Sequence, residues 1–113
     1  MATASNASPA PIKPLRGVRV LSLALNLPGP AALMRLRAMG ATCTKAEPPG
    51  PPSMPAGTPG DPMGQYNRKA YATLHDGVKV ITVDLKTEKG QAALHRALAS
   101  TDVLLTSFRP SAL

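Results

Sequence analysis

The sequence has few cysteine and aromatic residues, and both shortages exclude classes of protein. Cys43 is the only cysteine, so an internal disulfide and a zinc site with two cysteine ligands are excluded. Its neighbours are typical of a strand, which favours a buried and unreactive thiol. Aromatic residues make up 3% of the chain, and tryptophan is absent. Because proteins that bind single-stranded nucleic acids stack bases on aromatic rings, this composition argues against that function.

Acidic residues and long apolar runs are scarce as well. The chain has 6 Asp and Glu residues against 13 Lys and Arg residues, a net charge of +7 that favours anionic partners such as nucleotides, nucleic acids or acidic membranes. The apolar run at residues 18–25 contains Arg19 and is followed by the turn sequence NLPGP. A run this short is unsuited to export or to a membrane span, so we expect a cytoplasmic protein without membrane contact.

Proline and glycine are abundant and divide the chain into regions. Seven of the 13 prolines lie between Pro48 and Pro62. Their pairing with glycine is incompatible with a helix or a central strand and predicts a Pro/Gly-rich loop at residues 47–64. Residues 1–13 are small, polar and proline-containing, which predicts a disordered leader. The remainder, residues 14–113, is predicted to be one partial domain.

The pattern of apolar residues predicts strands and helices in alternation. Strands are expected at residues 18–25, 41–46, 78–84 and 103–106, and helices at residues 31–39 and 91–99, with a weaker helix at residues 65–75. Gly40 is placed to end the first helix, and Thr87 to cap the last one. Because parallel strands need a crossover helix, this order predicts an α/β fold, a doubly wound parallel sheet made of βαβ units.

Motifs that carry catalysis are missing. The first strand is not followed by GxGxxG, and the sequence contains no P-loop, HExxH or GxSxG pattern. His95 is predicted to be a solvated residue of a helix, and His75 to be a cap or turn residue. Glu47 and Asp84 lie near strand ends, where Asp84 is expected to accept backbone hydrogen bonds. We therefore predict no catalytic residue and no metal site in this chain.

The sequence indicates ligand binding more clearly than catalysis, and the residues that indicate it come directly after the predicted strands. Lys86 precedes a helix N-terminus, which suits a phosphate, although an ordinary solvated lysine fits the position equally well. Phe108 follows the last strand, where its ring can stack on an adenine or plug the core. Residues 26–27, 84–86 and 107–109 all follow strands and should meet at one edge of a parallel sheet. This convergence favours a nucleotide-like anionic ligand.

Three segments resemble the amino-terminal part of CoA-transferase family III, the group that includes formyl-CoA transferase, carnitine CoA-transferase and alpha-methylacyl-CoA racemase. They are PLRGVRVLSLALNLPGPAALMRLRAMGATCTKAEPP, GDPMG and VITVDLKTEKGQAALHRALASTDVLLTSFRP. Their order and spacing agree with the family from residue 14 to the end of the chain. Departures such as Ser22, where the family has aspartate, suggest a divergent subfamily.

The resemblance implies a Rossmann-like parallel-sheet fragment, part of the large domain of a two-domain protein whose two subunits interlock as a homodimer. It implies CoA or a CoA thioester as the substrate, with no covalently bound cofactor. The implied CoA contacts are Asn26, Leu27, Val83, Lys86, Ser107 and Phe108. The family's catalytic aspartate lies downstream of the last segment, so the resemblance implies a fragment that is inactive alone.

Three hypotheses follow. The favoured one is a truncated CoA-transferase-like protein, whose full-length relative transfers CoA between carboxylic acids or racemises an acyl-CoA, with this segment supplying part of the CoA site. The alternative is a non-catalytic basic module for nucleotides or nucleic acids, which would bind unrelated polyanions in a salt-sensitive way. The third is a domain without a ligand that folds only against a partner chain.

Overall fold

The computed structural model describes residues 12–108. The predicted leader at residues 1–13 therefore falls almost entirely outside the described residues. The elements are, in order, β1 (Arg19–Ser22), α1 (Pro28–Ala38), β2 (Thr42–Glu47), α2 (Pro62–Tyr66), α3 (Arg68–Leu74), β3 (Lys79–Thr82), α4 (Glu88–Ala99) and β4 (Val103–Leu105). The predicted alternation of strands and helices is confirmed.

The four strands form one parallel sheet in the order β3-β2-β1-β4. β1 pairs with β2 from Arg19 opposite Thr42 onward, and with β4 from Val20 opposite Val103 onward. The chain thus moves outward from β1 to β3 and then returns to the other side of β1. This reversal is the topological switch point of a Rossmann-like sheet, and ligands of such sheets bind beside it at the carboxyl ends of the strands.

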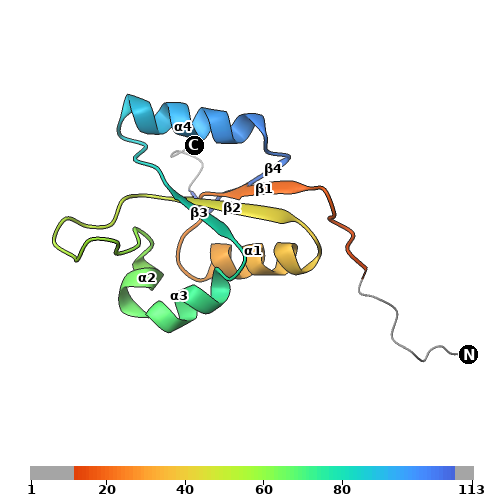
Figure 1. Cartoon of the computed structure of the whole chain (residues 1–113), viewed down its shortest axis with the longest axis horizontal. Coiled ribbons are helices and arrows are strands. Elements are labelled where there is room, and N and C mark those ends of the chain that lie inside the picture. Colours follow the sequence, from red (N-terminus) through yellow and green to blue (C-terminus); the bar gives the residue numbers. More distant parts are fainter. Residues whose placement is uncertain (1–11, 109–113) are drawn as a thin grey trace, which may run out of the picture.

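Helices cover both faces of the sheet, so the molecule has three layers (Figure 1). On the face of α1, Leu33 packs with Val20 and Cys43. On the face of α4, the buried residues Leu21 and Val83 pack against Leu94 and neighbouring side chains. Successive strand residues alternate between the two faces, and both faces of β1 and β2 are buried although their sequences, RVLS and TCTKAE, are only partly apolar.

Helix boundaries differ from the expectations at three places, one of which is α4, which begins at Glu88 instead of residue 91, directly after its cap Thr87. The loop expected at residues 47–64 is also shorter than predicted, because Glu47 ends β2 and α2 begins at Pro62. α1 begins at Pro28 instead of residue 31, because Leu27 already has helical angles and Pro28 lies in the first turn, where no backbone N–H is needed. The single helix expected at residues 65–75 is wrong. Asn67 leaves helical geometry there, and its side chain accepts a hydrogen bond from Ala70 N–H, so that α2 ends and α3 begins.

The Pro/Gly-rich segment between β2 and α2 folds back on itself. Thr58 is buried and donates a hydrogen bond of 2.6 Å from its hydroxyl to the Pro55 carbonyl. A Cβ atom at Gly60 would lie 1.7 Å from the carbonyl oxygen of Pro48, so the two ends of the segment meet only because residue 60 is glycine. This close approach delivers the following residue, Asp61, to the end of β2.

Candidate functional site

An apolar pocket of about 240 Å³ opens at the carboxyl ends of the strands. Its lining comes from the segments after β1, β2, β3 and β4. The lining residues are Leu23, Leu25, Ala46, Glu47, Pro48, Val83, Asp84, Leu85, Lys86 and Phe108. Because the segments after β1 and β4 both contribute, the apolar pocket lies at the topological switch point, where a doubly wound sheet is expected to bind its ligand.

The predicted contact residues fall into two groups. Val83, Lys86 and Phe108 line the apolar pocket. Leu27, which is 58% exposed, instead lines a shallow hollow against α3, together with Asn67 and other residues. Asn26 and Ser107 are exposed and line neither cavity. The structure thus brings Val83, Lys86 and Phe108 together, and leaves Ser107 and the turn after β1 outside the apolar pocket.

Lys86 lies in a turn that is stabilised by hydrogen bonds of the nearby residues Asp84 and Thr87. Its N–H donates a 3.0 Å hydrogen bond to the carboxylate of Asp84, which confirms the expected role of Asp84. Thr87 caps α4 as predicted, accepting from Gly90 N–H at 2.9 Å. The exposed ammonium of Lys86 therefore stands beside both the apolar pocket and the N-terminus of α4, where an anionic group is favoured.

The turn after β1 has an unusual backbone geometry. Asn26 has a φ of 63°, in the left-handed region that few residues other than glycine adopt. Its N–H donates a hydrogen bond of 3.0 Å to Oδ1 of Asp61. The same oxygen accepts from Met63 N–H at 2.9 Å, as the cap of α2. A fully buried carboxylate therefore holds the turn that the resemblance connects with CoA.

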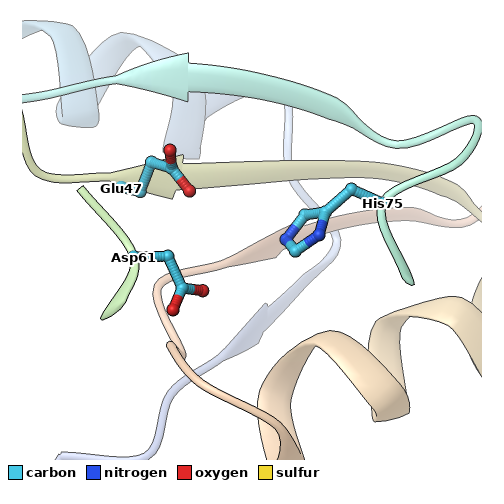
Figure 2. A group of neighbouring side chains, drawn as sticks. All are labelled: Glu47, Asp61 and His75. Carbon is cyan, nitrogen blue, oxygen red and sulfur yellow. The ribbon is translucent and has the colours of Figure 1, made fainter. Parts of the chain in front are cut away.

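Four side chains surround the buried ammonium of Lys45 at the end of β2. Together with Lys45 we call them the Lys45 cluster: Lys45, Glu47, Asp61, Tyr71 and His75. Lys45 is completely buried. Its Nζ pairs with Asp61, lies 3.3 Å from Glu47 Oε2 and lies 2.8 Å from His75 Nε2. The ammonium therefore hydrogen-bonds to Asp61 and His75 and forms an ion pair with Glu47. Figure 2 shows Glu47, Asp61 and His75 pointing toward this common centre.

Hydrogen bonding fixes the protonation state of His75. Its Nδ1 lies 2.7 Å from the Tyr71 carbonyl oxygen, which can only accept, so Nδ1 carries the proton and Nε2 accepts from Lys45. Burial lowers the pKa of His75, and the positive charge of Lys45 lowers it further. Tyr71 donates to the Glu47 carboxylate at 3.1 Å, and burial, followed by the Glu47 charge, raises the pKa of its hydroxyl.

The Lys45 cluster contains donor types that a metal ion would also take. Ligand atoms of Glu47, Asp61 and His75 all lie within 4.8 Å of one another. Lys45 contacts each of these three residues, so the protein places its own cation among them. The arrangement is therefore a buried ionic network, centred on Lys45, that joins β2, the Pro/Gly-rich segment and α3.

The sequence predicted individual residues of the Lys45 cluster but not their contact with one another. His75 is the C-cap of α3, as predicted, but it is also buried against Lys45, which was not predicted. The available signal was Lys45 itself, a charged residue inside a predicted strand that is covered on both faces. Such a residue requires buried partners. His95 is exposed and Cys43 is buried, and burial raises the pKa of the Cys43 thiol, as expected for an unreactive residue.

Within residues 12–108, none of the helices is long and apolar enough to cross a membrane.

Comparison with known proteins identifies related sequences. The sequence model of CoA-transferase family III matches residues 15–113. The chain is 38% identical over 110 residues to succinyl-CoA–D-citramalate CoA-transferase of Chloroflexus aurantiacus, a match that covers 91% of this chain and 25% of the relative. It is 35% identical over 106 residues to human succinyl-CoA:glutarate CoA-transferase, covering 90% and 23% of the two chains.

Solved structures agree with these matches. A Mycobacterium tuberculosis protein, described as a probable fatty acyl-CoA transferase, superposes with a TM-score of 0.75 at 34% identity, covering 90% of this chain and 27% of that one. A CaiB/BaiF family protein from Brucella suis gives a TM-score of 0.64 at 28% identity, covering 91% and 28%. The chain therefore spans about a quarter of the length of the relatives that it matches, at their amino-terminal part.

Proposed function

Because this chain belongs to CoA-transferase family III, we propose that it supplies part of a CoA-binding site. The whole protein would transfer CoA between carboxylic acids, or racemise an acyl-CoA, with a CoA thioester as substrate. Transfer itself would depend on the catalytic aspartate, which the family resemblance places downstream of the last matching segment. A homodimer and a cytoplasmic location belong to the same proposal and follow from the family resemblance.

The observation that carries the proposal is the apolar pocket at the switch point. Lys86 and the N-terminus of α4 offer positive charge at its rim, which suits a phosphate of CoA. Phe108 also lines the apolar pocket, and an aromatic ring there suits the adenine of CoA. A ligand with both a flat apolar part and phosphates matches this combination. Nothing in the comparisons supports the alternative of a basic nucleic-acid-binding module.

The first test is the titration of CoA into the chain by calorimetry. Lys86→Ala removes the charge at the pocket rim, and we expect CoA affinity to fall about tenfold, as for one lost charge-assisted hydrogen bond. Lys89→Ala is the matched control, because Lys89 is also exposed and lies in the first turn of α4, outside the pocket lining. We expect it to change the affinity less than twofold.

Two outcomes would contradict the proposal. Equal weakening by Lys86→Ala and Lys89→Ala would indicate general attraction of an anion to a basic protein. Binding of DNA or ATP as tight as that of CoA, with a steep loss of affinity in salt, would favour the basic-module alternative.

A further inference from the structure

A path of hydrogen bonds and ion pairs joins the predicted CoA contact after β3 to the predicted CoA contacts after β1. Val83 N–H donates to the Glu47 carbonyl oxygen at 2.8 Å. The carboxylate of Glu47 lies 3.3 Å from the ammonium of Lys45, which also pairs with Asp61. Asp61 in turn accepts from Asn26 N–H at 3.0 Å. The segment after β3 and the turn after β1 are therefore connected through the Lys45 cluster.

Asp61 is held so firmly that it can act as a fixed point. Its side chain is completely buried, Oδ2 pairs with Lys45, and Oδ1 accepts from the backbone N–H groups of Asn26 and Met63. If the carboxylate turned away, it would leave a buried ammonium with one acceptor fewer, which is strongly unfavourable. A charged acceptor also forms a stronger hydrogen bond than a neutral one. This bond stabilises Asn26 in its left-handed conformation.

We propose that Asp61, clamped by Lys45, is a positioning residue that holds the Asn26–Leu27 turn in its ligand-binding geometry. Through Glu47, the same clamp couples this turn to Val83 and the segment that carries Lys86. The inference rests on the proposed CoA site, because the turn is relevant to function only if it contacts the ligand. None of the comparisons assigns a role to Asp61 or to Lys45.

The positioning itself is tested without ligand, by amide hydrogen exchange of the isotope-labelled chain. The side chain of Asn26 is exposed, so slow exchange of its amide would report the bond to Asp61. We expect Asp61→Ala to speed exchange at Asn26 at least tenfold. Asp61→Asn keeps an oxygen for Asn26 but removes the charge facing Lys45, and should speed exchange by a smaller factor.

Thr58→Val is the matched control. Thr58 is buried in the same Pro/Gly-rich segment, and its replacement also removes one hydrogen bond, but Thr58 contacts neither Asn26 nor Lys45 through the hydrogen bonds and ion pairs described above. It should leave exchange at Asn26 within twofold of wild type. Wild-type exchange at Asn26 as fast as in an unstructured peptide would overturn the inference, even if Asp61→Ala failed to fold. An unchanged rate in folded Asp61→Asn would show that the clamp does not hold the turn.

CoA titration then separates this inference from the proposed function. We expect Asp61→Asn to weaken CoA binding about tenfold, and Thr58→Val to leave it within twofold. Unchanged CoA affinity in Asp61→Asn, alongside binding by wild type, would overturn the inference and leave the proposed function standing. A wild-type chain that binds no CoA would overturn the proposed function and the ligand-binding role of the Asn26–Leu27 turn. Hydrogen exchange at Asn26 would still decide whether Asp61 positions this turn.

Discussion

Lys45 places a positive charge where no water reaches it, and the surrounding residues explain how the fold tolerates that charge. Asp61 and His75 accept hydrogen bonds from its ammonium, and Glu47 forms an ion pair with it at 3.3 Å. Its Nζ also lies 5.3 Å from the centre of the Tyr71 ring. A buried ion pair of this kind contributes little net stability compared with apolar packing, but it strongly penalises any rearrangement that separates the partners. At the scale of single residues, the cluster therefore specifies geometry.

The neutral state of His75 makes stability depend on pH. Because the pKa of His75 is lower in the folded chain than its usual value of about 6.5, the unfolded chain binds more protons below that pH. The contribution of His75 is therefore complete above pH 6.5 and is lost as the pH falls through its folded pKa. We expect the free energy of unfolding, measured by urea denaturation, to decrease between pH 6.5 and pH 5.

His75→Gln retains an acceptor for Lys45 but does not titrate, so it should flatten this pH dependence. His95→Gln is the control, because His95 is exposed and should leave the slope unchanged. Equal slopes in wild type and His75→Gln would show that another group carries the effect. Asp102 does not interfere, since its hydrogen bonds with Arg19 lower the pKa of its carboxyl below the usual range.

The residue scale is also where the sequence was least informative. Lys45 and Asp61 are 16 positions apart, and His75 is 30 positions from Lys45, so no local spacing indicates that they meet. Their contact depends on where the Pro/Gly-rich segment and α3 come to lie, and this is a property of the tertiary fold. A lysine inside a buried strand signals that partners exist, but it does not say which residues they are.

At the scale of elements, local chemistry determines where most helices begin and end. Thr87 is the predicted N-cap of α4, and Gly40, with a φ of 105°, follows the C-cap Met39 where α1 ends. Both could be predicted, because helix ends depend on the residue type and its place beside an apolar run. The division between α2 and α3 was missed. Asn67 is a good cap, but no apolar period reveals it, since α3 contains no buried residue.

The cap of α4 makes a testable contribution to stability. Thr87 accepts from Gly90 N–H and donates to the Asp84 carbonyl at 2.9 Å each, so it joins the helix to the turn that carries Lys86. We expect Thr87→Ala to lower the free energy of unfolding by about 1 kcal/mol, measured by urea denaturation. Thr73→Ala is the control, because its hydroxyl only donates to Lys69 O within α3, where the change should be close to neutral.

If Thr87→Ala lowered the free energy of unfolding no more than Thr73→Ala, the capping role of Thr87 would be contradicted. This result would also indicate that the turn around Lys86 is held by Asp84 alone.

At the scale of the whole molecule, strand order determines where a ligand can bind. The alternation of strands and helices predicted parallel pairing, and that pairing brings the carboxyl ends of all four strands to one edge. Sequence alone could not show that Leu27 would face α3, or that Val83, Lys86 and Phe108 would share one pocket. These details depend on the orientation of the turns after the strands. For the turn after β1, Asp61 and the Pro/Gly-rich segment determine that orientation.

The most direct test of the CoA site is to map CoA binding by amide chemical shifts in the isotope-labelled chain. We predict that CoA shifts the amides of Val83, Lys86 and Phe108 in a saturable way. Arg19 and Lys79, which line a cavity with amino-end residues of the sheet such as Thr42, should remain unaffected. Shifts centred on Arg19 and Lys79, or the absence of any saturable shift around the apolar pocket, would contradict the account.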